Sequence, residues 1–246
     1  MTNNDGGGNY GEPSADNIGT YTLGVVVDMD DGLYVSDATN HRVLYFANDG
    51  NTTADRVYGQ WDNFSTGVPD GGGRIGAPNS RSLNFPRGLA LDSGGGLYVA
   101  DRDNNRVLYF APDGDTIADR VYGQSDNFAT NADGNDGKGE PGPPTADNLS
   151  HPKGVAVDGA GGVYIADSLH HRILYFAPGK TTAERVWGQA GRFVTGVINN
   201  DGSGASRSTG PDNLNLPQNL WLDAAGLLYA TDTGNNRTLV IDIKVR

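Results

Sequence analysis

The chain of 246 residues contains no cysteine, which excludes disulfide bridges and thiolate metal sites. It also lacks an apolar run approaching the roughly 20 residues needed to cross a bilayer, so we expect no membrane insertion. Basic residues are few: 18 Lys and Arg stand against 30 Asp and Glu, for a formal net charge of −12. Because nucleic acids and anionic membrane surfaces attract basic proteins, this balance argues against both as partners.

The first residues, MTNNDGGGNYGEP, lack the basic and apolar segments of a secretory signal peptide. The sequence therefore leaves the cellular compartment open, including secretion or display at the cell surface with a leader absent from this chain. It equally leaves open whether the chain is a natural full-length protein or an excised or engineered piece.

Glycine is abundant, with 37 residues, and 12 prolines add further turn-forming content. One sequence motif recurs four times. Each copy contains an arginine, and the spacings between them are 64, 66 and 65 residues (Arg42, Arg106, Arg172 and Arg237). The four copies read LYVSDATNHRVLYF (33–46), LYVADRDNNRVLYF (97–110), VYIADSLHHRILYF (163–176) and LYATDTGNNRTLVI (228–241). So constant a period indicates a repeat architecture.

Each repeat contains short runs of β-branched and aromatic residues bounded by Gly, Asp, Asn and Pro, which is typical of strands. Four such runs occur in the second repeat, at 88–92, 97–101, 106–110 and 120–124. The last of them reads RVYGQ, and the fourth repeat has no counterpart to it. We therefore expect four strands in each of three repeats and three strands in the last.

Four consecutive antiparallel strands repeated around an axis form a β-propeller. We predict an all-β fold with one propeller domain over residues 1–246 and four blades. The expected blades are approximately 1–60, 61–124, 125–189 and 190–246, the last lacking its own outer strand. Residues 1–10 or 244–246 are local candidates to supply that strand. Otherwise the last blade has an open edge through which the chain could form a homo-oligomer.

The strand-ending aspartate, the Tyr-Val-Ala-Asp run and the Asn-Asn-Arg or Asn-His-Arg run before an apolar strand together resemble the NHL repeat. With its RVYGQ run, the chain is similar to a long-repeat bacterial variety of that family. The resemblance covers nearly the whole chain and implies a β-propeller. NHL propellers usually have five or six blades, so four repeats depart from the commoner pattern. The family includes protein- and RNA-binding modules and a few lyases, so the resemblance implies no single function.

Two charged residues recur in every repeat, an aspartate that ends the second strand and an arginine five residues later. Because they occur once in each blade, we interpret them as structural, with the aspartate accepting turn N–H groups and the arginine bridging loops or blades. They are Asp37, Asp101, Asp167 and Asp232, with Arg42, Arg106, Arg172 and Arg237.

The two residues before each arginine vary between Asn and His. If the strands run outward from the axis, these turns share one face of the propeller with the long loops between blades, which we call the loop face. Loops on a rigid scaffold commonly bind ligands, so the turn residues are our ligand-binding candidates. They are Asn40, His41, Asn104, Asn105, His170, His171, Asn235 and Asn236.

Metal sites have weaker support in the sequence. The four histidines are not at equivalent places in the repeat, and the metal-binding set of the NHL-type amidating lyases cannot be mapped onto the chain. The acidic loop NADGNDGKGE (131–140) offers oxygen ligands for calcium in Asp133, Asn135 and Asp136, although it does not fit the EF-hand template. We expect no cofactor other than this calcium.

No catalytic serine elbow or phosphate-binding loop is present. The sequence thus favours a non-catalytic recognition or scaffold module that binds a protein or a carbohydrate through the loop face. The alternative is a metal-dependent lyase or hydrolase with a cation on the propeller axis.

Overall fold

In the computed structural model, the chain is an all-β, four-bladed propeller, which confirms the predicted fold. The structure describes residues 3–4, 10–71, 76–135, 138–200, 205 and 209–244. In this part of the chain there is no α-helix, and no helix is long and apolar enough to cross a membrane.

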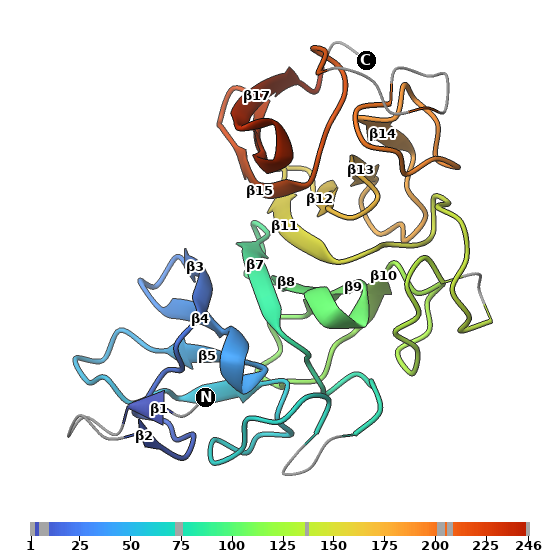
Figure 1. Ribbon diagram of the computed structural model, residues 1–246. Helices are drawn as coiled ribbons and strands as arrows, with labels where there is room; N and C mark the ends of the chain where they lie inside the picture. The colour runs from blue at the N-terminus through green and yellow to red at the C-terminus, as the bar shows by residue number, and fades with distance from the viewer. Residues whose placement is uncertain are drawn as a thin grey trace.

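Each blade is an antiparallel sheet whose strands follow one another in chain order, with four strands in blades 1–3 and three in blade 4. The first strands of the blades gather in the middle of the molecule, and the later strands lie progressively outward (Figure 1). Blade 1 comprises β3 (Thr22–Val27), β4 (Leu33–Asp37), β5 (Arg42–Phe46) and β6 (Arg56–Tyr58). Blade 2 comprises β7 (Pro86–Leu91), β8 (Leu97–Asp101), β9 (Arg106–Phe110) and β10 (Arg120–Tyr122). Blade 3 comprises β11 (Pro152–Val157), β12 (Val163–Asp167), β13 (Arg172–Phe176) and β14 (Arg185–Trp187). Blade 4 comprises β15 (Pro217–Leu222), β16 (Leu227–Asp232) and β17 (Arg237–Asp242).

The turns between the second and third strands are tight. In three blades they contain a single 3-10 turn, namely η1 (Ala38–Asn40), η2 (Arg102–Asn104) and η3 (Thr233–Asn235). The residue just before the arginine is left-handed in all four blades, with φ near 52° at His41, Asn105, His171 and Asn236. Asn and His tolerate this conformation better than most residues, which accounts for their recurrence at this position.

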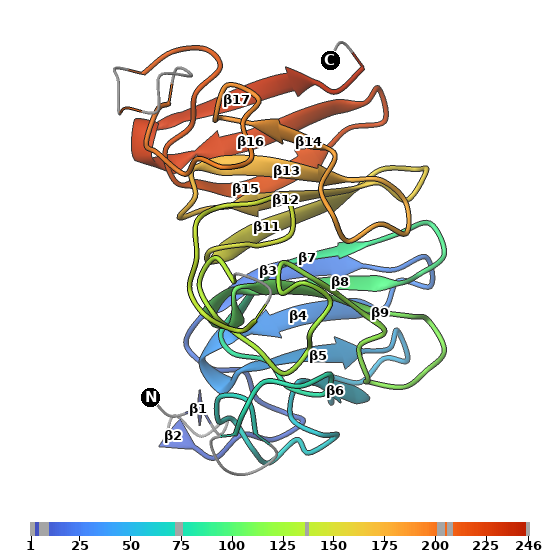
Figure 2. The same ribbon diagram turned by 90° about the vertical axis from the view of Figure 1, so that its right-hand side faces the viewer.

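The described N-terminal residues, 3–4 and 10–11, do not complete the last blade. β1 (Asn3–Asn4) pairs with β2 (Tyr10–Gly11), beside blade 1 and away from β17 (Figures 1 and 2). The described part of residues 1–10, namely residues 3–4 and 10, therefore does not supply the missing strand, and the other residues of this stretch lie outside the described chain. Within the described chain, β17 pairs with β16 alone.

The hydrophobic core lies between adjacent blades rather than at the centre. Three clusters fill the spaces between blades 1 and 2, 2 and 3, and 3 and 4. An aromatic residue of one outer strand meets a phenylalanine of the next blade edge-on at two of these interfaces. The ring centroids are 5.0 Å apart for Tyr58 and Phe110, and 5.1 Å apart for Tyr122 and Phe176. Each blade thus depends on its neighbours for burial of its apolar surface.

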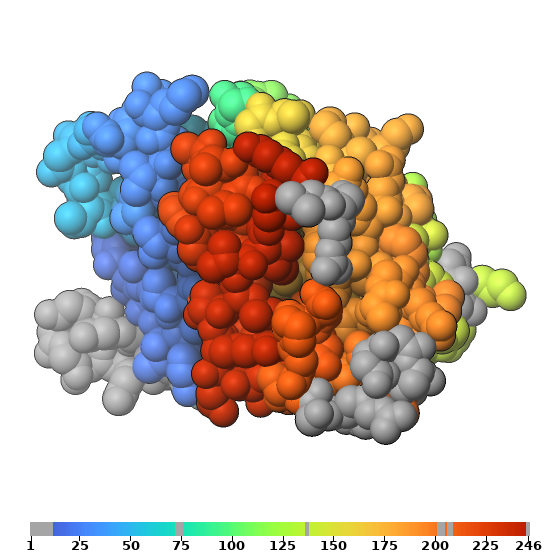
Figure 3. Space-filling model, turned by 90° about the horizontal axis from the view of Figure 1, so that it is seen from above, coloured from blue at the N-terminus to red at the C-terminus, as the bar shows by residue number. Residues whose placement is uncertain are grey.

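The outward faces of blades 1 and 4, which we call the end faces, lack such a neighbour. Val25 and Val27 of β3 are more than half exposed, whereas the residues at the same register in blade 2 pack against the first core cluster. Trp221 of β15 is 61% exposed, where blade 3 has the buried Ala156. Figure 3 looks onto blade 4 (red), whose outward surface is covered by no other blade.

Candidate functional site

An aspartate–arginine ion pair lies at the loop face of every blade. The Nε of the repeat arginine donates to Oδ2 of the aspartate that ends the second strand. The N–O distances are 2.8 Å in blade 1, 2.7 Å in blade 2, 2.6 Å in blade 3 and 2.7 Å in blade 4. Both side chains are fully buried in blades 1–3. Charges removed from water in this way require further hydrogen bonds to be tolerated.

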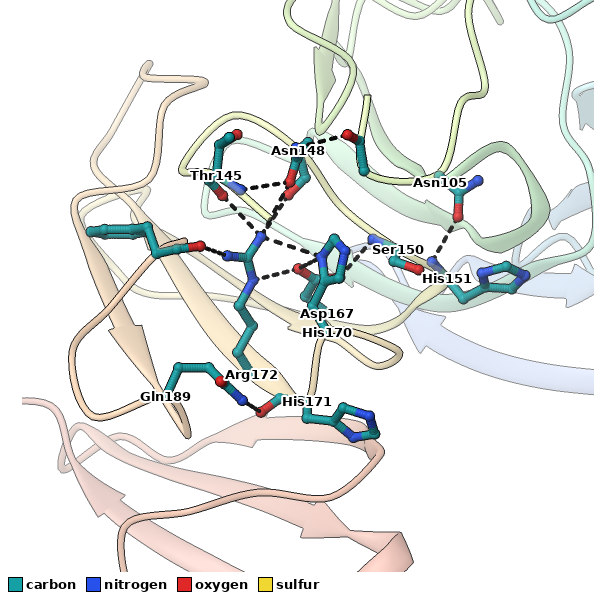
Figure 4. Close-up of polar contacts among 12 residues, drawn as sticks. Asn105, Thr145, Asn148, Ser150, His151, Asp167, His170, His171, Arg172 and Gln189 are labelled. Carbon is teal, nitrogen blue, oxygen red and sulfur yellow. Dashed lines mark hydrogen bonds and ion pairs between the residues drawn. The ribbon is translucent and has the colours of Figure 1, made fainter. Parts of the chain in front are cut away.

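The remaining guanidinium N–H groups supply those bonds by holding the long loops. In blade 2, Arg106 Nη1 donates to the carbonyl of Phe128 in the following loop (2.7 Å). Its Nη2 donates to the carbonyls of Asn79 (3.0 Å) and Ser82 (2.8 Å) in the preceding loop. Blade 3 repeats the arrangement around Arg172, as Figure 4 shows. One arginine therefore joins the loops on both sides of its blade.

The first residue of each Asn/His pair serves the same ion pair. Asn40, Asn104 and Asn235 donate through Nδ2 to the aspartate Oδ2 of their own blade, at 2.7–2.8 Å. In blade 3 the ring Nδ1 of His170 lies 2.9 Å from Asp167 Oδ2 (Figure 4). These four candidates thus make internal contacts beneath the loop face.

The second residue of the pair joins one blade to the next. The backbone N–H of Phe85 donates to His41 Nδ1 (3.0 Å), that of His151 to Asn105 Oδ1 (2.8 Å), and that of Leu216 to His171 Nδ1 (3.1 Å). We call these three bonds the blade latches. Asn236 has the same backbone conformation, but its side chain makes no hydrogen bond within the described residues and is exposed.

The latch histidines are neutral hydrogen-bond acceptors. Burial lowers the pKa of His41 and of His171 below the ordinary value of 6.5, and at His171 the neighbouring His170 lowers it further. A protonated Nδ1 cannot accept the N–H of Phe85 or Leu216, so the latch and the charge exclude each other.

The buried aspartates differ between blades 2 and 3. Burial raises the pKa of Asp101 to about 6, against the lowering effect of Arg106, and the nearby Asp70 adds to the rise. Burial also acts on Asp167, but the charges of His170 and Arg172 outweigh it and lower the pKa of that carboxyl. The difference arises because the neutral Asn104 stands in blade 2 where blade 3 has His170, and because Asp70 shares that amide, Asp70 Oδ1 lying 2.7 Å from Asn104 Nδ2.

The calcium candidates are only partly within the described chain. Asn135 is buried and its Nδ2 donates to Gln124 Oε1 (2.8 Å), while its Oδ1 accepts the N–H of Gly139 (2.9 Å). The backbone carbonyl of Asp133 accepts the N–H of Gly142 (3.3 Å). Asp136 lies outside the described residues. Among the residues that are described, no group of three or more His, Asp or Glu could hold a metal ion.

Several residues of the loop face were missed by the sequence reasoning. Leu169, Val194 and Ile198 are exposed apolar side chains on the turn of blade 3 and on the loop that follows it. A group of basic residues from blades 2 and 3 was missed as well. The sequence could have pointed to these residues because they depart from the repeat: the blades that lack them have other residue types at the same positions.

Comparison with solved structures supports the class of fold. The chain is similar to a streptogramin B lyase (TM-score 0.53, 13% identity), covering 95% of this chain and 54% of that one. It is similar to a catalytically inactive virginiamycin B lyase from Staphylococcus aureus with quinupristin (TM-score 0.51, 14% identity, 96% and 59% covered). It is also similar to a chain of a nidogen/laminin complex (TM-score 0.54, 20% identity, 90% and 60% covered). The chain therefore spans between half and two thirds of the length of these structures, and such identities show the fold alone.

The repeat itself is recognised in the middle of the chain. The NHL repeat matches residues 83–110 and 149–176, which hold the inner strands of blades 2 and 3. The chain is thus consistent with the NHL-repeat propellers, as its repeated sequence motif predicts. No curated protein sequence matches the chain significantly.

The blade latches predict an asymmetry between two chemically identical substitutions. Asn105→Ala leaves the buried N–H of His151 without an acceptor and removes the bond from Asn105 Nδ2 to the Asn131 carbonyl. Asn236→Ala carries the same left-handed backbone strain but breaks no latch. We expect Asn105→Ala to lower the free energy of unfolding by about 1–3 kcal/mol more than Asn236→Ala in urea denaturation. Equal losses would contradict the latch role.

The latch histidines also predict a pH dependence. Because their pKa is lower in the folded chain, the unfolded chain binds more protons below about pH 6.5, and stability falls as the pH drops through that range. The double substitution His41→Asn and His171→Asn places the residue of blade 2 at both positions. We expect this variant to show a smaller loss of thermal stability between pH 7 and 5. Because Asp101 and Asp167 titrate in both proteins, their contribution cancels, and an unchanged pH dependence would refute the assignment.

Proposed function

We propose that the chain is a non-catalytic recognition module that binds a protein partner through the loop face. The observation that carries this proposal is the exposure of three large apolar side chains on that face, Leu169, Val194 and Ile198, which are 41–69% accessible. Exposed apolar groups on a constrained surface commonly mark protein-binding sites.

The loop that carries two of these side chains is held in place. Gly196 packs against His170, since a Cβ added there would lie 3.1 Å from His170 Cδ2. On the other side, the amides of Asn199 and Asn235 exchange two hydrogen bonds, of 3.1 Å and 2.7 Å. A surface ordered before binding loses less conformational entropy when a partner docks, which favours affinity.

Carbohydrate is the competing ligand class from the sequence. Trp61, at the start of the loop after β6, is 52% exposed and could stack on a sugar ring. We favour a protein because the three aliphatic side chains outnumber the exposed aromatics Trp61 and Tyr21 on the described loop face. The propeller in the nidogen/laminin complex is a precedent for such a fold within a protein assembly.

We expect partner binding to depend on the three aliphatic side chains. A photo-crosslinking residue at Arg192, on the loop face, should capture a protein from the native lysate, and one at Asp113, on the opposite hairpins, should not. With the purified partner, the serine triple variant of Leu169, Val194 and Ile198 should bind roughly tenfold more weakly or worse. Met29→Ser, which alters the 84% exposed methionine between β3 and β4, should bind normally.

Three results would overturn the proposal of a protein partner on the loop face. Capture from Asp113 alone would place the partner on the opposite face. Unchanged affinity of the serine triple variant would show that the three exposed aliphatic side chains do not bind the partner. Glycan-array binding that is lost in Trp61→Ala, without any captured protein, would assign the loop face to carbohydrate.

We propose further that two copies of the chain close a ring through the end faces. Each internal interface joins the forward face of one blade to the backward face of the next, and Trp221 and Val25 lie on the two unmatched faces. Asn236 stands where the latch to a following blade would begin. Two four-bladed chains would give eight blades, within the range of four to eight that propellers adopt.

This assembly predicts twice the mass of one chain at high concentration. Light scattering should give a dimer that Trp221→Glu and Val25→Glu each dissociate, because each places a charge in an apolar contact. Val194→Glu, an equally exposed position on the loop face, should leave the mass unchanged. A monomer at all concentrations, or equal effects of the three variants, would exclude closure by a second copy.

A further inference from the structure

One group of basic residues breaks the repeat. Arg87 is the second residue of β7, Lys153 is the second residue of β11, and Arg102 begins η2. Arg87 and Lys153 share one repeat position, where blades 1 and 4 have Leu23 and Gln218, and at the position of Arg102 the other blades have Ala38, Ser168 and Thr233. A residue that the fold needs recurs in each blade, so this departure indicates a role other than forming a blade.

The topology brings these residues to one place. β7 and β11 are adjacent innermost strands, and they approach so closely that a Cβ on Gly88 would lie 2.5 Å from the carbonyl oxygen of Lys153. Arg87 and Lys153 stand at the loop-face ends of these strands, and Arg102 stands on the turn after β8. β7 and β11 lie in the middle of the molecule (Figure 1), so their loop-face ends, which carry Arg87 and Lys153, border the axis.

The positive charge there is largely uncompensated. Among the described residues, Arg102 pairs with Asp103 (3.0 Å), whereas Arg87 and Lys153 have no carboxylate partner. Burial and the charges of Arg87 and Arg102 lower the pKa of Lys153 to about 8. In a chain of net charge −12, uncompensated cations gathered at one point require an explanation.

Two buried nitrogen atoms in the same group lack a hydrogen-bond partner, Arg102 Nε and His151 Nδ1. Both side chains are nonetheless held in position. Arg102 lies over the Phe85 ring at 5.3 Å, and the backbone of His151 is latched by Asn105. In Figure 4 the His151 ring points away from the Asp167 cluster, which leaves Nδ1 free of that network. Buried polar atoms are rarely left without a partner, so an orphaned pair points to a missing ligand.

We propose that Arg87, Arg102, Lys153 and His151 form a binding site for a small oxyanion with a phosphate or carboxylate group. A guanidinium donates two parallel N–H groups to such an anion, and a lysine ammonium adds a point charge. On binding, His151 takes up a proton and its Nδ1 becomes a donor. The site is independent of the proposed partner surface, so it stands or falls separately.

The four histidines provide the readout. The experiment is a titration of the whole chain with inorganic phosphate, and a second titration with citrate, at constant ionic strength set by sodium chloride. Ring ¹⁵N shifts should show the pKa of His151 rising with the bound anion, while the pKa values of His41 and His171 stay unchanged. The charged groups that act on His151 are Arg102, Asp103, Asp133 and Lys153. Binding should weaken above pH 8 as Lys153 loses its proton.

Matched variants are offered by the repeat itself. Lys153→Gln copies Gln218 and Arg102→Ser copies Ser168, so both residues already occur at these positions in folded blades. Each should raise the dissociation constant measured by calorimetry roughly tenfold or more. Lys180→Gln, at an exposed lysine after β13, should leave it unchanged.

The outcomes separate the sources of the anion. Saturable binding of phosphate alone assigns a phosphate group, and saturable binding of citrate alone assigns a carboxylate; both support the site. If neither phosphate nor citrate shifts the His151 signals beyond the sodium chloride control of the same ionic strength, the proposed site is overturned. An equal response of Lys180→Gln and Lys153→Gln would show general screening of charge, and would overturn it as well.

Discussion

The buried aspartate–arginine pair is the interaction on which the rest of the loop face depends. Removing both charges from water is costly, and the attraction between them offsets that cost only when the remaining donors are satisfied. In blade 2 those donors end on carbonyls of two different loops, at Asn79, Ser82 and Phe128. The ion pair and the loop conformation therefore require each other. Lysine could not replace arginine, because one ammonium cannot reach the aspartate and two loops in a planar fork.

Arg237 shows the same dependence, because in blade 4 one of the two loops is missing from the described chain. Its Nε and Nη2 make the bonds of the repeat, to Asp232 and to the carbonyls of Gly210 and Asn213. Within the described chain no loop follows blade 4 to accept Nη1, and the Arg237 side chain is 24% exposed where its three counterparts are fully buried. The arginine thus becomes buried only when loops are present on both sides of its blade.

Much of the fold follows from the period of the sequence. The strands of blade 2 are found at 86–91, 97–101, 106–110 and 120–122, close to the predicted runs, because turn residues bound each short apolar segment. The loop face was harder to interpret. Asn104 and Asn105 are neighbours of the same type, yet one bonds within its blade and the other to the next blade. The second bond spans 46 residues of chain, and no local pattern encodes it.

Departure from the repeat is the more informative signal for function. Asp101, Asn105 and Arg106 recur in kind because every blade has its ion pair and blades 1–3 are each latched to the next blade. Arg87 and Lys153 occupy the same repeat position in blades 2 and 3 only, and blades 1 and 4 have the neutral Leu23 and Gln218 there. In a structure built from near-identical units, a contact required for folding must be present in each unit, whereas a ligand site need occur only once. A residue that the repeat can replace without loss of the blade is therefore retained for something other than the blade, and the basic group at the axis satisfies that condition.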